Sequence, residues 1–492
     1  MMRRHRRGLT HLVTAWALGA VLLLVASPAG AQSVDEVSRL MSQWQIAEAG
    51  EMIEQLEQSQ PGSPGVQFVR ARYDFLQGRY DSALSRLDQL LHNTDANGEW
   101  QRFRNLVSNT GKVTRDYEKY TSESGRFEIY VEPGKDRVLV PYAMEALEAA
   151  YESIGEELGH KPPTPIRVEV YPQTSTLAKV SGLTDQEIRT SGTIALCKYN
   201  RLMITSPKAL LQGYGWVDTL IHEYIHFVIN SKTSNRVPIW MHEGLAKFLE
   251  HRWRGPEAHH LPPSSEHLLA KRVEKDDLIT FEQMHPSMAK LPSQEDAATA
   301  FAEVYTVMEY LHERIGKGSF RKLLEAVNET GEAKSAFERV VGKPFSRFER
   351  EWKAYLGQRP RPETPEDYGY QNKLVFKDEQ QEGQKIDELD QPEAKDHMKL
   401  GEMLQAKGRF EAAVVQYRKA VGATDKPNPR LRTRLAQALT ETGHPAEALE
   451  VLEPARQFYP SYVTVWLELG KASLGADRTD KAIDYLLEAA RI

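Results

Sequence analysis

The C-terminal part of the sequence repeats itself, and this repetition constrains the fold more than any other feature. Small residues recur at a fixed distance, 35 residues from Gly408 to Gly443 and 34 residues from Ala448 to Ala482. Large apolar residues lie between them: Leu400, Tyr417, Leu435, Leu452, Trp466, Leu469 and Leu486. A unit of this length is a pair of helices that cannot bury its apolar face alone, so neighbouring units must stack into a solenoid.

This pattern resembles the tetratricopeptide repeat (TPR), whose small positions let two antiparallel helices approach closely. We predict TPR repeats over residues 396–492. A fainter version precedes the centre of the chain, where Ala49 and Ala83 again lie 34 residues apart. Residues 34–110 are therefore predicted to form a degenerate TPR-like helical region. For both segments, an ordinary helical bundle is the alternative.

A segment of different composition separates the C-terminal repeats from the middle of the chain. Residues 361–395 are acidic, contain prolines and lack periodicity, which predicts a linker. The isolated segment, residues 115–360, begins with two strand-like stretches, "GRFEIYVEP" and "PIRVEVYP", on either side of a helical one. Mostly helical sequence follows. This order predicts an α+β domain in which a mixed sheet is combined with helices.

The first 31 residues have the features of an export signal. Arginines at the start are followed by an apolar run from Leu12 to Ala26 and by small residues at Ala29 and Ala31. We predict a signal peptide over residues 1–31, cleaved after Ala31. An uncleaved anchor is the alternative, although the run is shorter than the ~20 residues that span a bilayer.

The rest of the composition narrows the location and the partners. No later segment is apolar enough to cross a membrane, so no stable span is expected after signal cleavage. The single cysteine, Cys197, excludes an intramolecular disulfide. These features fit a protein of the bacterial periplasm or cell envelope, or a secreted one. A net charge of −6 gives no general attraction for nucleic acid.

The stretch "LIHEYIHFVIN" is the strongest candidate for chemistry. His222 and His226 lie four residues apart in a helical pattern, so both imidazoles could reach one metal ion. Glu223 would lie beside that ion, where it could act as a general base on water. Two histidines on a helix are equally satisfied by backbone carbonyls, so a third ligand must decide.

A third ligand follows in "SNRVPIWMHEGLAKFLEHR", which predicts a second helix. Glu243 lies seventeen positions after His226, enough for a short connection that returns the chain beside the first helix. His222, His226 and Glu243 would complete a His₂Glu set for Zn²⁺. Gly244 would let the backbone approach a neighbouring helix closely, and Glu250 could accept the free N–H of a ligand histidine.

Together these motifs resemble the peptidase MA-like branch of the gluzincin metallopeptidases, over roughly residues 120–355. The resemblance rests on His222-Glu223-x-x-His226 followed by Pro238-x-Trp240-x-x-Glu243-Gly244-Leu245-Ala246. It implies zinc ligands at the two histidines and Glu243, and a general base at Glu223. The sequence lacks the Gly-x-Met-Glu-Asn motif of the large zinc aminopeptidases, so endopeptidase action is the default expectation.

Two further segments are similar to parts of the same family. "SGTIALCKYNRLMITSP" resembles the strand at the edge of the substrate cleft, where a peptide could add itself as another strand. An ordinary core strand is the alternative. Tyr305 lies in a later helical segment and could donate to the oxyanion of the tetrahedral intermediate. A buried core tyrosine is the alternative for that residue.

The sequence thus predicts an exported zinc metallopeptidase acting on a protein or peptide substrate, with the TPR segments recruiting a substrate or a protein partner. The hypothesis from another class is a non-catalytic TPR scaffold with a structural or inactive zincin-like domain. Retention of Glu223 favours catalysis, because a closed structural site needs no base.

Overall fold

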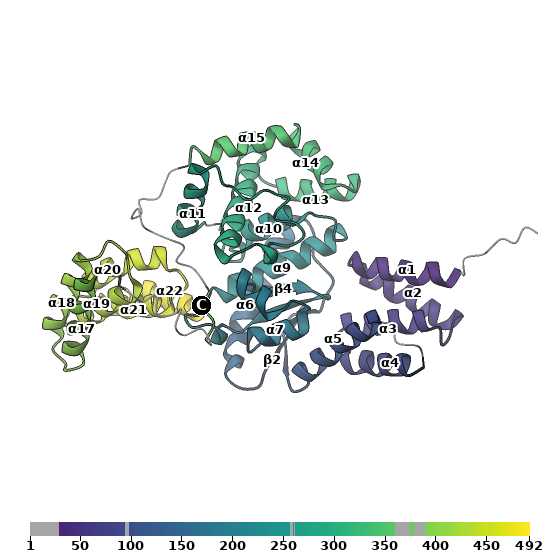
Figure 1. Cartoon of the computed structure of the whole chain (residues 1–492), viewed down its shortest axis with the longest axis horizontal. Coiled ribbons are helices and arrows are strands. Elements are labelled where there is room, and N and C mark those ends of the chain that lie inside the picture. Colours follow the sequence, from purple (N-terminus) through teal and green to yellow (C-terminus); the bar gives the residue numbers. More distant parts are fainter. Residues whose placement is uncertain (1–28, 94–97, 256–258, 260, 360–373, 378–388) are drawn as a thin grey trace, which may run out of the picture.

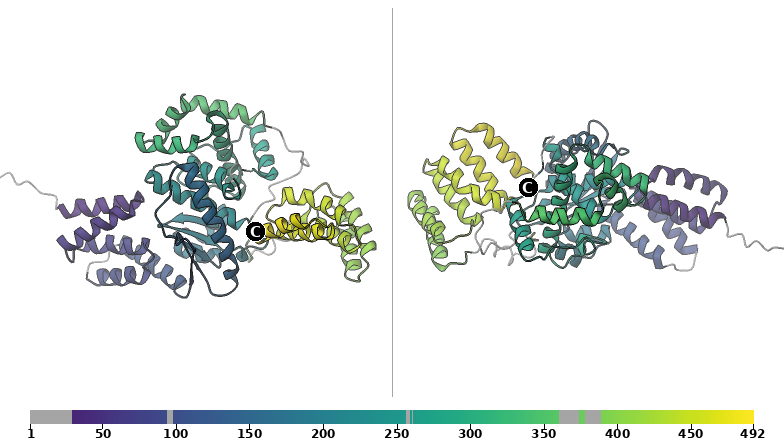
Figure 2. Two further views of the ribbon diagram at one scale, coloured as in Figure 1. Left: turned by 180° about the vertical axis from the view of Figure 1, so that it is seen from behind. Right: turned by 90° about the horizontal axis from the view of Figure 1, so that it is seen from above.

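The computed structural model describes residues 29–93, 98–255, 259, 261–359, 374–377 and 389–492. The predicted signal peptide therefore lies almost entirely outside the described residues. Figure 1 shows a central region of sheet and helices, with one helical array on each side of it. Figure 2 shows the same arrangement from behind and from above. Within the described residues, no helix has the length and apolarity that a membrane span requires.

The N-terminal array consists of five antiparallel helices: α1 (Ala29–Ser42), α2 (Ile46–Ser59), α3 (Pro64–Leu76), α4 (Tyr80–Asn93) and α5 (Gly98–Thr114). Ala49 and Ala83, the small residues of the faint repeat, are both fully buried. Gly50 shows how closely the helices approach, because a Cβ there would lie 2.5 Å from the Tyr73 hydroxyl. The sequence pattern thus marks real helix–helix contacts.

The central region contains one five-stranded sheet in the order β1-β2-β3-β5-β4. Its strands are β1 (Glu118–Thr121), β2 (Phe127–Val131), β3 (Ile166–Tyr171), β4 (Ala195–Lys198) and β5 (Arg201–Thr205). The β2–β3 and β3–β5 pairs are parallel, whereas β1 and β4 pair antiparallel at the two edges. The two predicted strands are β2 and β3, and the sheet is mixed as expected. "SGTIALCKYNRLMITSP" forms a hairpin, β4 and β5, rather than one strand.

Helices cover both faces of the sheet. One face packs on α6 (Leu139–Leu158) and α9 (Trp216–Thr233) through the alternate residues Ile166, Val168 and Val170 of β3. The other face, with Tyr171, packs on α7 (Thr174–Ser181). A short helix, α8 (Asp185–Ser191), leads into the β4–β5 hairpin. Because β3 is covered on both sides, all but one of its residues are buried.

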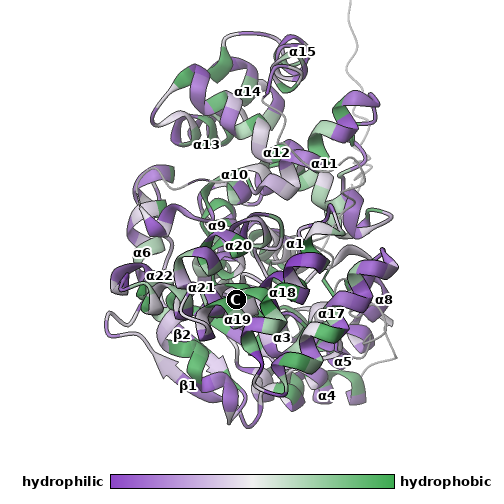
Figure 3. Ribbon diagram, turned by 90° about the vertical axis from the view of Figure 1, so that its left-hand side faces the viewer, coloured by the Kyte–Doolittle hydropathy of each residue, from purple (hydrophilic) through white to green (hydrophobic). Residues whose placement is uncertain are grey.

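A helical part follows α9 and completes the central region. It contains α10 (Ile239–Leu249), α11 (Pro263–Glu274), α12 (Gln294–Ile315), α13 (Ser319–Thr330), α14 (Ala333–Val341) and α15 (Phe345–Leu356). Short 3₁₀ turns occur at Lys135–Val138, Pro207–Ala209, Arg252–Arg254 and Met288–Lys290. The predicted order of strands first and helices afterwards is confirmed. Figure 3 shows hydrophobic and hydrophilic residues alternating around many of the helices, as one buried face requires.

The C-terminal array forms three helical hairpins, from α17 (Pro392–Gln405) and α18 (Phe410–Gly422), through α19 (Pro429–Glu441) and α20 (Pro445–Phe458), to α21 (Val463–Gly475) and α22 (Thr479–Ala490). Its last residues reach the central region. The backbone N–H of Tyr214 donates to the Ile492 carbonyl at 3.1 Å, and the Trp216 indole donates to the Ala490 carbonyl at 3.2 Å. Arg254 forms an ion pair with Glu488. The array therefore lies against the start of α9.

Part of the predicted linker also contacts the central region. Most of residues 361–395 lie outside the described residues, but Val375 and Phe376 are buried. Phe376 forms an antiparallel bridge with Leu210, just before α9. Within the predicted linker, residues 374–377 add a short extended segment to the domain. Helix α17 begins at Pro392, inside the predicted bounds of the linker.

Candidate metal centre

Helix α9 carries both motif histidines and is the most deeply buried helix of the central region. Its apolar residues surround the axis, and only a few side chains between Trp216 and Thr233 reach solvent. The helix ends where Ser234 adopts a left-handed conformation with φ of 53°. His222 and His226 share one face, and their rings lie 4.7 Å apart between centroids. The four-residue spacing thus gives the geometry expected from it.

Glu243 of α10 meets both imidazoles. Its Oε2 lies 3.1 Å from His222 Nε2 and 3.2 Å from His226 Nε2. The three ligand atoms all lie within 4.8 Å of one another. The return of the chain that the sequence predicted therefore brings these three side chains together.

The spacing of these atoms fits a zinc ion. Zinc bonds of ~2.0–2.1 Å at tetrahedral angles place neighbouring donor atoms about 3.3 Å apart. The measured nitrogen–oxygen separations of 3.1 and 3.2 Å are close to that value. Two imidazoles and one carboxylate are also a donor set that zinc commonly takes at catalytic sites. His222, His226 and Glu243 are accordingly the residues that would hold the ion.

Each histidine is oriented from behind through its other ring nitrogen. His222 Nδ1 lies 3.0 Å from Glu250 Oε2, so its N–H donates to the carboxylate. His226 Nδ1 contacts His242 Nδ1, and His242 Nε2 lies 2.9 Å from Asn230 Oδ1. Both contacts leave Nε2 facing the common centre, and such outer partners fix the tautomer of a ligand histidine.

These contacts shift the pKa values of the cluster. Burial lowers the pKa of His222, but its contacts with Glu243 and Glu250 outweigh burial and raise it to about 10. For Glu250, burial raises the pKa, and the charge of Lys247 together with the His222 contact lowers it to about 2. Burial and the charge of His226 hold the pKa of His242 well below its usual value. His242 is therefore neutral and can accept the His226 N–H.

A close helix contact holds Glu243 in place. At Gly244, the next residue of α10, a Cβ would lie 2.8 Å from the Val304 carbonyl of α12. Any side chain larger than hydrogen would push the two helices apart. The role expected for Gly244, close approach to a neighbouring helix, is observed, although the neighbour is α12 rather than α9.

The cluster forms part of the wall of a cavity of about 510 Å³. Glu223 lies in this wall and accepts a backbone N–H from Cys197 of β4. Burial raises the pKa of Glu223, which brings a carboxylate closer to the range useful for a general base. Residues 193–197 line the same cavity, so the edge strand of the sheet runs along the cleft.

Tyr305 does not lie in this cavity. It is 1% exposed, its hydroxyl lies 3.0 Å from His259 Nδ1, and its ring packs against Phe248. Among the described residues, no tyrosine lines the cleft. The geometry therefore gives no support to the oxyanion role and fits the alternative, a buried core tyrosine.

We did not predict from the sequence that two further residues, His242 and Asn230, lie at this centre. His242, next to Glu243 in the sequence, orients His226 from behind. Asn230 lies within α9, one turn after His226, and contacts His242. Both face the ligand histidines from fixed helical positions, so the i+4 spacing of His226 and Asn230 was an available signal.

A buried carboxyl on α12 gives a prediction about pH. Burial raises the pKa of Glu303 from 4.5 to about 8, and the one hydrogen bond that its carboxylate accepts among the described residues is from the Ile279 N–H at 2.8 Å. The folded state holds this proton more tightly than the unfolded state, so stability should fall as the pH rises from about 4.5 to 8. In Glu303→Gln, this decrease in the free energy of unfolding should be smaller by on the order of a few kcal/mol.

Thermal unfolding of both proteins at about pH 5 and about pH 9 measures this difference. Between these two pH values, the melting temperature of Glu303→Gln should change less than that of the wild type. Glu54→Gln, on the exposed side of α2, serves as the control and should follow the wild type. An equal pH response of wild type and Glu303→Gln would contradict the assignment.

The family comparison agrees with the domain that the fold and the metal centre define. Residues 146–358 match the model of the Peptidase MA superfamily, and residues 429–472 match a tetratricopeptide repeat. The chain thus carries a Peptidase MA superfamily domain followed by a TPR segment, as its sequence motifs predicted. The second match begins at α19 and ends within α21.

Among solved structures, the chain is similar to native leukotriene A4 hydrolase from Saccharomyces cerevisiae, with 13% identity and a TM-score of 0.29. It is also similar to yeast LTA4 hydrolase in complex with bestatin, with 13% identity and a TM-score of 0.32. Each match covers 74% of this chain but only 58% of the other protein. The sequence matches no curated protein.

Proposed function

We propose that this protein is an exported, zinc-dependent endopeptidase. The observation that carries the proposal is the position of Glu223 beside three converging ligand atoms, in the wall of an open cleft. The ligand atoms of His222, His226 and Glu243 come from two helices and lie within 4.8 Å of one another. Three protein ligands with a base alongside are typical of catalytic zinc sites, which keep a position open for water or substrate.

Each residue of the centre would have a separate role in the reaction. A zinc ion held in such a set supplies a Lewis acid that polarises a carbonyl and lowers the pKa of water. Glu223 would take the proton from the attacking water and deliver it to the leaving amine, which requires a carboxylate within hydrogen-bond reach. Glu250 and His242 would hold the two histidines in the tautomer that leaves Nε2 free.

Strand β4 offers a way to position the substrate. It is an edge strand, paired only with β5, and its residues from Ala195 to Cys197 line the cleft. An extended peptide could pair with its free edge, so that main-chain hydrogen bonds bind it without regard to sequence. The absence of the Gly-x-Met-Glu-Asn motif favours cleavage within a chain rather than at a free N-terminus.

The repeat arrays would recruit a protein partner or the substrate itself. Exposed apolar residues of the C-terminal array, among them Met403 at 53% and Val415 at 49%, are available for such contacts. The leader sequence would direct the protein to the periplasm or cell envelope, or out of the cell.

Metal removal tests the proposal. The purified protein should contain zinc, and a chelator should abolish cleavage of a peptide library because the ligand set then lacks its ion. Added zinc should restore cleavage. Zinc at 100 times its dissociation constant should also stabilise the folded state by about 2.7 kcal/mol, which thermal unfolding measures.

The alternative function predicts a different result. A scaffold with a structural zinc site would bind the metal and gain stability, yet cleave no peptide before or after chelation. A protein that binds no zinc would contradict both the peptidase and the structural zinc site, and would favour a scaffold with an inactive zincin-like domain. Calcium or magnesium added after chelation is the control, since neither suits two imidazole ligands.

A further inference from the structure

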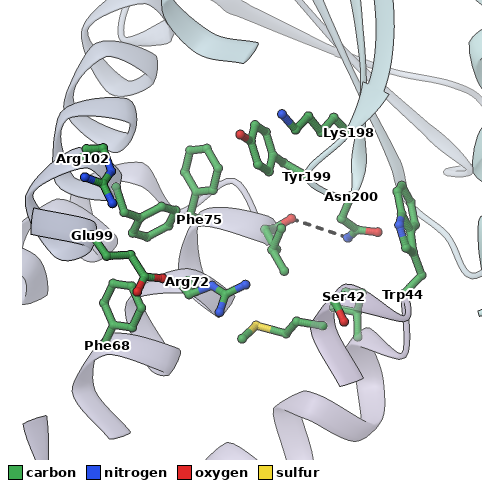
Figure 4. A pocket seen from close by; sticks show the side chains of 14 residues that line it. Ser42, Trp44, Phe68, Arg72, Phe75, Glu99, Arg102, Lys198, Tyr199 and Asn200 are labelled. Carbon is green, nitrogen blue, oxygen red and sulfur yellow. Dashed lines mark hydrogen bonds between the residues drawn. The ribbon is translucent and has the colours of Figure 1, made fainter. Parts of the chain in front are cut away.

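A second cavity, of about 490 Å³, lies between the N-terminal array and the β4–β5 hairpin. Figure 4 shows it from close by. Most of its lining is aromatic or basic: Trp44, Phe68, Phe75, Phe103, Tyr199, Arg72, Arg102 and Lys198. Among the described residues, Glu99 is the only acidic one in the lining, against three cations. The lining is thus basic, although the whole chain has a net charge of −6.

Arg72 is the central cation of this pocket. Its guanidinium points into the cavity in Figure 4, and its one hydrogen bond among the described residues is to Ser38 Oγ at 3.3 Å. It forms no ion pair within the described part of the chain, although Glu99 lies near enough to offset part of its charge. Burial lowers the pKa of Arg72. A partly desolvated cation without a bonded carboxylate favours binding of an anion.

The linings of the two cavities adjoin at two places. On one side, residues 193–197 line the metal cleft, and the next residues, Lys198 to Asn200, line the second cavity. On the other side, Asn235 lines the metal cleft and donates to the backbone carbonyl of Ser42, which lines the second cavity. A peptide that pairs with β4 and continues beyond Lys198 would therefore enter the second cavity.

Contacts between the β4–β5 hairpin and α3 shape the second cavity. The Asn200 side chain donates to the Leu76 carbonyl at 3.5 Å, and the Tyr199 and Phe75 rings lie 5.2 Å apart. Below them, the guanidinium of Arg201 lies over the Phe75 ring at 4.7 Å. These contacts join the hairpin to α3, so a ligand would meet a preformed site, which reduces the ordering cost of binding.

We propose that this cavity is a remote subsite for the peptide substrate, which recognises an acidic residue next to an aromatic one outside the cleft. The inference rests on the proposed peptidase function. The carboxylate would pair with Arg72, with Arg102 at the rim, and the aromatic ring would pack on the Phe68, Phe75 and Phe103 side chains. Strand pairing along β4 is independent of sequence, so this pocket would supply specificity that the cleft itself lacks.

Binding tests the subsite without any cleavage. The full-length Glu223→Gln protein, loaded with zinc, is titrated into fluorescein-labelled peptides that share a central sequence and carry Phe-Glu or Phe-Gln at either end. Fluorescence anisotropy should show about tenfold tighter binding of one Phe-Glu peptide than of its Phe-Gln partner, as expected for a charge-assisted hydrogen bond. Arg72→Gln should remove this difference, and the exposed Arg102→Gln should reduce it.

Arg104→Gln is the matched control. It removes the same charge from α5, but Arg104 pairs with Asp88 outside the cavity, so the preference for Phe-Glu should persist. Equal binding of the Phe-Glu and Phe-Gln peptides by the Glu223→Gln protein would overturn the subsite. So would a preference for Phe-Glu that stays unchanged in both Arg72→Gln and Arg102→Gln. Because Arg102 is exposed, its variant tests the subsite even if Arg72→Gln fails to fold.

Cleavage separates this inference from the proposed function. With otherwise wild-type protein, Arg72→Gln should raise KM for the long Phe-Glu peptide about tenfold relative to a short peptide confined to the cleft, with little change in kcat. If the wild type cleaves neither peptide, the peptidase proposal fails, whereas the anisotropy result still decides whether the cavity binds the acidic segment. A parallel rise in KM for both peptides would contradict a remote subsite.

Discussion

Replacement of Glu223 by glutamine should lower peptide hydrolysis by about 10²–10⁴-fold and leave the zinc content unchanged. Glutamine keeps the shape of the side chain but cannot take a proton from water. Glu223 is not one of the three converging ligands, so the ion should remain bound. The measurements are kcat/KM against a cleaved library peptide and the metal content of the same preparation.

Two comparisons make that result specific. Glu54→Gln, on the exposed face of α2, makes the same chemical change far from the cleft and should keep wild-type activity. Glu243→Gln, at a ligand position, should lose both zinc and activity. Substantial cleavage by Glu223→Gln would show that another group acts as the base, and loss of zinc from it would show that Glu223 contributes to metal binding.

Replacement of Glu169 by glutamine should destabilise the protein by about 3–5 kcal/mol. Glu169 lies at the middle of β3 with no exposed surface and forms ion pairs with Arg167 at 2.6 Å and Arg201 at 3.1 Å. It also accepts hydrogen bonds from the hydroxyls of Tyr80 and Tyr171. The variant would leave Arg201, which is 1% exposed, with an uncompensated buried charge.

Urea unfolding followed by tryptophan fluorescence measures this loss. Glu128→Gln, on the neighbouring strand β2, is the control, because its ion pair with Lys119 is more exposed and worth about 0–1 kcal/mol. A similar loss for both variants would mean that the Glu169 cluster contributes no more than a surface pair. Since Tyr80 belongs to α4, the N-terminal array should loosen from the sheet in the same transition.

The metal centre could be predicted from the sequence because its geometry is local. The spacing of His222 and His226 fixes their common face, and a connection as short as the one before Glu243 leaves the second helix few places to lie. Glu250 follows from the same reasoning, two turns beyond Glu243. The alternation of β2 and β3 marked the sheet, and the period of 34 to 35 residues marked the helical arrays.

What the sequence did not predict depends on contacts between distant segments. Tyr305 was placed near the substrate by family resemblance alone, whereas its packing against Phe248 fits the alternative, a buried core tyrosine. Phe376 is buried because it pairs with Leu210, which lies far away in the sequence. No local sequence pattern indicates this pairing. The second cavity is formed by residues from Met41 to Asn200 in four separate stretches, so neither its shape nor its charge appears as a motif.

Helix α9 is held at both ends by the flanking arrays. The Trp216 indole at its start donates to Ala490, and near its end the Phe227 ring packs edge-on against Trp44 at 5.1 Å. Excising the central region at the boundaries suggested by its sequence would uncover both tryptophan contacts at once. A piece of this chain that keeps both tryptophan contacts of α9 must therefore extend beyond the central region on both sides.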